Sequence, residues 1–275
     1  MSRKPLADHA AFRTWPKQPR EWGPDGSGWR SWFGGGVVDG LCDVLDEHLA
    51  TRPGRDMSIA AIGCVPWLTS AAVVDRLAAL GSCCVVIDKS ENAPPPVLRK
   101  LSGSGFPNAA ITRLEDVMPA VDGAAPLVIG PYTPREATWH EIEAVRVVGW
   151  RAGKYKPLPH AKVLVLGQVG WVTYETPYGD QEEFRFIPSK VWWGSANWTE
   201  LSSMHLETGF LCDDLKLVAS ATDFVADLIA FSEPLSSQSA GPEPSMIEVP
   251  WDNEAMAQAS AERDDGYEDL YDDEE

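Results

Sequence analysis

The chain has 275 residues, of which 44% are hydrophobic, and its formal net charge is −18. The length allows one large domain or two small ones, and the composition is ordinary for a globular protein. No apolar run is as long as a membrane span, the first residues lack the apolar stretch of a signal peptide, and the five cysteines follow neither a disulfide framework nor zinc-ligand spacing. We therefore expect a cytoplasmic protein with reduced thiols and no transmembrane segment.

The negative charge is concentrated at the C-terminal end. Residues 241–275 hold thirteen acidic residues and a single arginine, whereas residues 1–240 are only mildly acidic. A stretch that is this acidic and has this few apolar residues does not fold alone. We therefore expect residues 236–275 to be a disordered tail. The mild acidity of the remainder argues against a basic surface built for duplex DNA.

Residues 1–33 are rich in Trp, Pro and Arg and are expected to form an irregular arm. The indoles alternate with arginines, a pattern that could stack on the bases of a single strand. Packing of the same indoles onto the domain is the alternative, and we favour that interpretation.

The next segments predict alternating helices and strands. Apolar residues recur at helical spacing over residues 37–49 and 69–81. Residues 58–68 read as a strand, and residues 82–90 as a second strand whose unalternating apolar run indicates burial on both faces. A strand, a helix and a strand in this order predict a right-handed crossover between parallel strands.

The rest of the chain continues the mixture of strands and helices. We expect one α/β domain over residues 34–235, in which a mixed, mostly parallel sheet is flanked by helices on both faces. The further elements are expected as a loop with a short helix at 91–106, strands at 124–133, 135–149, 160–167, 189–197 and 204–214, a hairpin at 172–188 with its turn at 177–180, and a helix at 213–232.

The strand at 160–167 begins with two ionisable side chains. Side chains two apart in a strand share a face, so His160 and Lys162 are expected to point the same way as Leu164. A reactive group needs such stiff placement. An imidazole beside an ammonium group is nevertheless weak support for a site when it stands alone.

A second polar group follows in the stretch GSANWT. Gly194 permits a tight turn, after which Ser195 and Asn197 present a hydroxyl and an amide near each other. Such neutral donors suit the oxygen atoms of a phosphate or a developing oxyanion. Capping of a helix N-terminus is the ordinary alternative for either residue.

A third polar group is Glu207, in an otherwise apolar strand. A buried carboxylate needs a partner, and a histidine ring that it orients is a natural one. A surface position on an edge strand, or an ion pair with an arginine or lysine, would account for it as well.

Taken in order, His160 and Lys162, Ser195 and Asn197, and Glu207 resemble the motifs of the phospholipase D superfamily of phosphodiesterases. The resemblance implies a phospholipase D-like fold and a metal-independent phosphodiesterase that needs no cofactor. It implies that His160 attacks phosphorus to form a phosphohistidine, that Lys162, Ser195 and Asn197 hold the phosphoryl oxygens, and that Glu207 orients His160.

The resemblance also implies a second histidine, which protonates the leaving oxygen and then activates water. No other histidine of this chain has a lysine two positions later. Members with a single motif assemble two copies of it across a dimer twofold, so we expect a homodimer in which each subunit supplies one His160.

The chain departs from the family pattern in two ways. The family's aspartate, seven positions after the histidine, is Gly167 here, and a long hairpin separates this glycine from Gly194. One hypothesis is that the hairpin lies over the site as a lid, with Asp180 in place of the missing acid. Loss of the aspartate is also the main argument for a degenerate member that only binds nucleic acid or a protein.

The substrate is expected to be a phosphodiester of nucleic acid. A positively charged stretch before the motif, containing Arg146, Arg151, Lys154 and Lys156, could attract such an anion, and we assign Lys154 and Lys156 to substrate binding. A solvated loop is the alternative for this stretch.

Phospholipid hydrolysis or phosphatidyl transfer is the second enzymatic interpretation, which an apolar groove near Trp192 and Trp193 would favour. The acidic tail could occupy the site as an autoinhibitor.

Overall fold

The computed structural model of the chain describes most of the expected domain. The described residues are 20–21, 29–89, 94–115, 117, 127–129, 139–149, 159–177, 179–237 and 246–248. Most of the expected arm and of the acidic tail, and with them the autoinhibition hypothesis, lie outside the described residues. Three short pieces of those segments do form strands, Arg20–Glu21, Arg30–Gly34 and Met246–Glu248.

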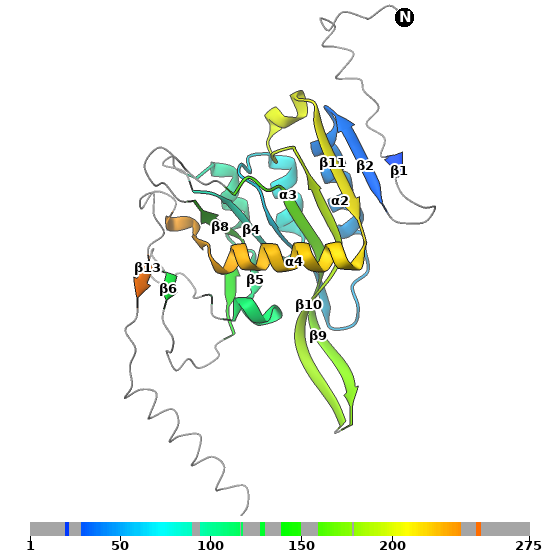
Figure 1. The fold of residues 1–275 in the computed structure, drawn as a ribbon, viewed down its shortest axis with the longest axis vertical. Coiled ribbons are helices and arrows are strands. Elements are labelled where there is room, and N and C mark those ends of the chain that lie inside the picture. Colours follow the sequence, from blue (N-terminus) through cyan, green and yellow to red (C-terminus); the bar gives the residue numbers. More distant parts are fainter. Residues whose placement is uncertain are drawn as a thin grey trace, which may run out of the picture.

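The centre of the molecule is one large mixed sheet (Figure 1), in the order β1-β2-β11-β10-β9-β3-β4-β5-β7, with β8 beside β4 and β12 beside β8. The strands are β1 (Arg20–Glu21), β2 (Arg30–Gly34), β3 (Met57–Cys64), β4 (Ser82–Asp88), β5 (Gly105–Pro107), β7 (Glu141–Glu143), β8 (Val145–Val148), β9 (Val163–Thr176), β10 (Gly179–Gly194), β11 (Glu207–Cys212) and β12 (Glu233–Pro234). A separate parallel pair is formed by β6 (Leu127–Ile129) and β13 (Met246–Glu248).

The helices agree with the periodicity of the sequence. They are α2 (Val37–Leu49), α3 (Ala71–Ala79) and α4 (Leu215–Ala230), with short 3-10 turns at η1 (Pro96–Leu101), η2 (Asn108–Ala110), η3 (Thr112–Leu114), η4 (Glu200–Met204) and η5 (Leu235–Ser237). The Ser70 hydroxyl accepts a hydrogen bond at the start of α3, and the Asp214 carboxylate accepts two at the start of α4. These side chains satisfy backbone N–H groups that a first helical turn leaves without partners.

The sheet is mixed, as expected, but most of its strand pairs are antiparallel, so the expectation of a mostly parallel sheet is wrong. Parallel pairing joins β4 to β3, β5 and β8, whereas the other pairs within this sheet are antiparallel. The reason lies in the connections, because β9, β10 and β11 follow one another through short links that return each strand beside its predecessor. The crossover through α3 does give the parallel pair β3–β4 that the sequence predicted.

Helices cover both faces of the sheet, which confirms that expectation. On one face α2 and α3 bury side chains such as Leu45 and Leu77 in the same apolar cluster as Leu164 of β9. On the other face α4 packs Val225 and Ile229 against the alternate residues of the same strands. All seven residues of β4 are buried, as expected for a strand covered on both faces.

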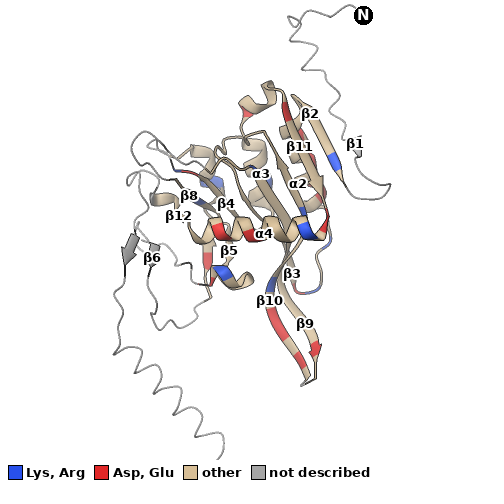
Figure 2. Cartoon of the chain, viewed as in Figure 1, with Lys and Arg blue, Asp and Glu red and all other residues tan. Residues whose placement is uncertain are grey.

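The two longest strands form a hairpin that reaches beyond the sheet (Figure 1). β9 pairs with β3 only as far as Gly170, and β10 pairs with β11 only over Val191–Gly194. The outer parts of both strands therefore pair only with each other, and Figure 2 shows several carboxylates along them. The register shifts between Pro188 and Lys190, where an irregularity interrupts the ladder.

Candidate active site

The predicted site residues come to one edge of the sheet. The pairs Cys64–Val163 and Val163–Trp193 align the end of β3, the start of β9 and the end of β10. The pair Gly194–Gly209 places the start of β11 beside them. The polar residues of all three motifs therefore lie just outside or at the ends of three adjacent strands.

His160 and Lys162 lie immediately before β9, which begins one residue later than the lysine. The Lys162 ammonium nitrogen is 2.9 Å from the carbonyl oxygen of His160 and 3.4 Å from each nitrogen of its ring. Lys162 is only 5% exposed, whereas His160 is exposed. An accessible imidazole is thus held against a buried cation.

The face assignment made from the alternation of side chains is confirmed within β9. Leu164 and Leu166 belong to the core on the α2 and α3 side, and Val165 belongs to the core on the α4 side. The backbone N–H of Gly194 donates to the carbonyl of Lys162 over 3.2 Å and so fixes the segment that precedes the strand.

Ser195 and Glu207 are directly bonded. The Ser195 hydroxyl donates to a carboxylate oxygen of Glu207 and accepts from the backbone N–H of Thr208 over 2.9 Å. The cap of the following turn η4 is Thr199, so the helix-cap alternative for Ser195 and Asn197 is wrong. The described contacts bring Glu207 to Ser195 and not to His160.

The charge of Glu207 acts on Lys162. Burial lowers the pKa of Lys162 below its ordinary value, and the Glu207 carboxylate opposes that change because it stabilises the ammonium form. The thiol of Cys64, at the end of β3, opposes it less; burial raises the pKa of this thiol to about 12, so it is neutral at physiological pH. The lysine and the carboxylate therefore share one electrostatic environment.

Asn197 lies in the turn between β10 and η4. Its side-chain oxygen is buried and has no hydrogen-bond partner among the described residues. Buried polar atoms in folded proteins are nearly always paired, so this unsatisfied acceptor is unusual. The turn itself is fixed, because the backbone N–H of Trp198 donates to Trp67 over 3.1 Å and its carbonyl accepts from Thr69 and Ser70.

Two glycines of the site region permit close backbone approach. A Cβ atom at Gly194 would lie 2.2 Å from the carbonyl oxygen of Thr208, so a side chain here would separate the end of β10 from the start of β11. A Cβ at Gly167 would lie 2.4 Å from the carbonyl oxygen of Ile187 and 2.8 Å from the ring of Phe186. The hairpin therefore leaves no space for the aspartate that the family carries at position 167.

The hairpin does not cover the site, so the lid expectation is wrong. Asp180 pairs with Glu175 near the tip of the hairpin, whereas the site lies at the opposite end of β9 and β10 (Figure 1). About thirteen residues of extended strand, roughly 43 Å at ~3.3 Å per residue, separate the two ends. Asp180 consequently does not replace the missing aspartate.

The basic stretch before the motif is only partly described. Lys154 and Lys156, the predicted substrate-binding residues, lie outside the described residues, as does Arg151. Arg146 is buried in β8, where it binds the Glu143 carboxylate and the Ser232 hydroxyl and carbonyl. This guanidinium group is therefore structural and does not attract a substrate from solvent.

Sequence reasoning missed the partners that hold the motif residues. Thr208 bonds Ser195 through its backbone, a contact that no side-chain pattern indicates. It also missed four exposed apolar side chains at or near this edge, in the β3–α3 connection and around η4: Trp67, Leu201, Met204 and Leu206. Their apolar character is visible in the sequence, but their exposure requires the fold.

Neither a membrane span nor a metal cluster is found in the part of the chain that the structure describes. None of its helices is long and apolar enough to cross a membrane. Within the same residues, no group of three or more His, Cys, Asp and Glu side chains is arranged to hold a metal ion.

No family model matches the sequence, and no curated protein matches it. The chain is similar in structure to NucT from Helicobacter pylori, with 9% identity over 74% of this chain and 96% of that one and a TM-score of 0.45. It is also similar to Nuc from Salmonella typhimurium, with 11% identity over 69% of this chain and 87% of that one and a TM-score of 0.35. Nuc is a phospholipase D family member. A third neighbour is a polyphosphate kinase from Porphyromonas gingivalis, with 15% identity and a TM-score of 0.35. The match covers 78% of this chain and 27% of that one. With similarities this distant, the functional assignment depends on the residues of this chain.

Proposed function

We propose that the chain is a phosphodiesterase of the phospholipase D type, which cleaves nucleic acid through a phosphohistidine and needs no metal. The observation that carries the proposal is the contact of Lys162 with the accessible imidazole of His160, within the same edge as Ser195 and Glu207. A nucleophile beside a cation and a hydroxyl matches what attack on a phosphate ester requires.

The reaction would proceed in two displacements. A ring nitrogen of His160 attacks phosphorus, and the bond between phosphorus and the leaving oxygen breaks as that oxygen takes a proton from a second imidazole. Water then attacks the phosphohistidine, the P–N bond breaks, and the second imidazole recovers a proton. Lys162 and Asn197 would hold the phosphoryl oxygens as negative charge develops, with Ser195 and Glu207 fixing the turn beside them. Lys154 and Lys156 would bind the phosphate backbone of the substrate.

We propose that the second imidazole is His160 of another copy of the chain. No described contact joins His160 to another imidazole, and the ring of His48 is buried against the carbonyl of Ala60. The exposed apolar side chains near this edge, Trp67, Leu201, Met204 and Leu206, would be covered by a partner subunit. His205, exposed near Glu207, is the alternative within one chain.

The decisive experiment is cleavage in EDTA, with single- and double-stranded DNA, RNA and phosphatidylcholine as separate substrates. We expect nucleic acid to be cleaved, cleavage to be lost in His160→Ala, and an acid-labile phosphohistidine to accumulate on the wild type with a slow substrate. Sedimentation should give a dimer. His205→Ala serves as the control and should retain activity.

The other outcomes separate the alternatives. A monomer that cleaves, with activity lost in His205→Ala, contradicts the dimer. Cleavage of phosphatidylcholine alone would support the phospholipid function, although Trp192 is buried in the core and Trp193 packs between Trp29 and Phe210. Activity that disappears in EDTA contradicts metal independence. Absence of cleavage with every substrate supports a degenerate member that only binds nucleic acid or a protein.

A further inference from the structure

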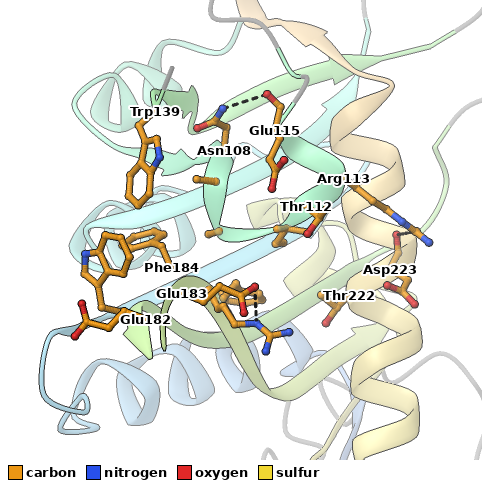
Figure 3. Close-up of a pocket in the computed structure, with 16 residues that line it drawn as sticks. Asn108, Thr112, Arg113, Glu115, Trp139, Glu182, Glu183, Phe184, Thr222 and Asp223 are labelled. Atoms are coloured by element: carbon orange, nitrogen blue, oxygen red, sulfur yellow. Dashed lines mark hydrogen bonds and ion pairs between the residues drawn. The ribbon is translucent and has the colours of Figure 1, made fainter. Parts of the chain in front are cut away.

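A second candidate site lies partway along the long strands, where the hairpin leaves the sheet (Figure 3). A cavity of about 650 Å³ opens there between the 3-10 turns η2 and η3, the hairpin and the middle of α4. Its volume is within the range of ligand-binding clefts in proteins. None of the predicted catalytic residues lines it.

One wall of this cavity is a cluster of three aromatic rings. Trp171 and Phe184 are directly opposite each other on β9 and β10, and Trp139 stacks on Trp171 with the ring centroids 5.3 Å apart and 23° between the planes. Trp139 is 55% exposed and Trp171 45%. Two stacked indoles that remain half exposed form an apolar surface of a kind that soluble proteins generally use for binding.

The charged residues of the cavity are mainly acidic. Both guanidinium groups are already engaged, since Arg113 binds Asp227 over 2.7 Å and Arg185 lies 3.4 Å from Glu183. Three other lining carboxylates, Glu115, Glu182 and Asp223, have no ion pair among the described residues. The cavity therefore offers aromatic faces together with free negative charge.

We propose that this cavity binds an arginine side chain presented by a partner polypeptide. A guanidinium group stacks on an indole face and forms paired hydrogen bonds with a carboxylate, so it uses both features of the wall at once. The polyanionic backbone of a nucleic acid would be repelled by the same carboxylates and by Glu175 and Asp180 nearer the tip of the hairpin. The proposal is independent of the proposed enzymatic function.

The test uses the full-length protein and short peptides of otherwise uncharged residues that carry two arginines, two lysines or two glutamates. Binding is followed through the indole N–H resonances in two-dimensional NMR spectra, with Trp139 and Trp171 assigned by single substitutions. We expect the arginine peptide to shift these two resonances and to leave that of Trp67, an equally exposed indole elsewhere, unchanged. The lysine peptide should bind about threefold more weakly, and the glutamate peptide should not bind.

Variants locate the binding within the cavity. Trp171→Ala should weaken binding of the arginine peptide about tenfold, and Glu182→Gln about threefold. Glu175→Gln removes the same charge from the same hairpin outside the cavity and should change the affinity less than about twofold. Since Glu182 is exposed, its substitution is not expected to disturb folding.

Several results would overturn the proposal. Equal shifts at Trp67, or equal weakening by Glu175→Gln and Glu182→Gln, would mean nonspecific attraction to an acidic protein. A single-stranded oligonucleotide that shifts Trp139 and Trp171 while the arginine peptide does not would make the indole pair a base-stacking site. Binding of the glutamate peptide would also contradict the proposed chemistry.

Discussion

Single residues determine how the candidate site departs from the family pattern. At Gly167 the backbone of the neighbouring strand lies where a side chain would begin, so the family's aspartate is excluded by packing. Burial lowers the pKa of Lys162 because the ammonium group loses solvation, and the nearby Glu207 carboxylate opposes part of that decrease. The sequence suggests a lost or replaced acid, whereas the structure gives the steric reason.

Gly167→Ala should destabilise the protein by about 1–3 kcal/mol, because the new methyl group meets a backbone oxygen that cannot move without distorting the hairpin. Urea unfolding measures the change. Gly103→Ala is the matched control, since no atom lies within 4 Å of a Cβ at that position, and its effect should stay within about 0.5 kcal/mol. Equal effects of the two substitutions would mean that the strand opposite Gly167 adapts freely.

If the proposed function holds, Glu207→Gln should move the alkaline limb of the pH–rate profile to lower pH. The carboxylate raises the pKa of Lys162, so its neutralisation lets burial lower that pKa further. The ammonium form holds the phosphoryl oxygen, and activity is therefore lost as pH rises through this pKa. Glu200→Gln, in the adjacent turn η4, should leave the limb in place; a limb that moves in both variants or in neither contradicts the coupling.

Elements differ in how well the sequence predicts them. The helices α2, α3 and α4 follow from apolar periodicity, and α3 and α4 also from capping residues, because both signals are local. The hairpin is longer than expected because Gly167, Gly170 and Pro188 suggest strand ends, whereas they permit close pairing and a register shift inside continuous strands. The pairing of β2 with β11 is long-range and has no signature in either segment.

The candidate site was predictable as a set of residues but not as a set of contacts. The motifs identify Ser195 and Glu207 from their order along the chain, yet their direct bond depends on how β10 and β11 align. The expected contact of Glu207 with His160 is not among the described contacts, since register decides which neighbour a side chain reaches.

At the start of α4, Asp214→Ala should cost about 1 kcal/mol of stability. The Asp214 carboxylate accepts hydrogen bonds from the N–H groups of Lys216 and Leu217, over 3.1 and 2.9 Å, and these donors have no partner within the helix. Thermal or urea unfolding gives the difference. Asp213→Ala removes a neighbouring carboxylate that makes no such bond, and it should be nearly neutral; a larger loss there would refute the capping assignment.

At the scale of the described domain, two apolar layers cover the two faces of the large sheet, and all five cysteines are buried in those layers. Burial raises the pKa of Cys42 to about 11 and that of Cys83 to about 12, from an ordinary value of 9.0. The thiols are therefore part of the core, as their lack of disulfide or zinc spacing in the sequence suggested.

Stability should fall as pH rises above 9. The unfolded chain releases thiol protons near pH 9.0, whereas the folded chain retains them, so the stabilisation is complete below 9.0 and is lost above it. Each such thiol contributes about 1 kcal/mol of loss between pH 9 and 10. Under reducing conditions, Cys83→Ala should make urea stability less pH-dependent over this interval. Val85→Ala, in the same strand, should lower stability equally at both pH values; parallel pH curves for the two variants would contradict this account.

The outer hairpin has one more consequence, which concerns self-association. From Val172 to Glu175, the side of β9 that faces away from β10 pairs with no strand among the described residues, so it is a template for adding a strand from another molecule. Glu175, Asp180 and Glu182 place negative charge along this ribbon, so two copies repel each other while those carboxylates are ionised. Acidification removes this protection, and aggregation should begin at the hairpin before the core unfolds.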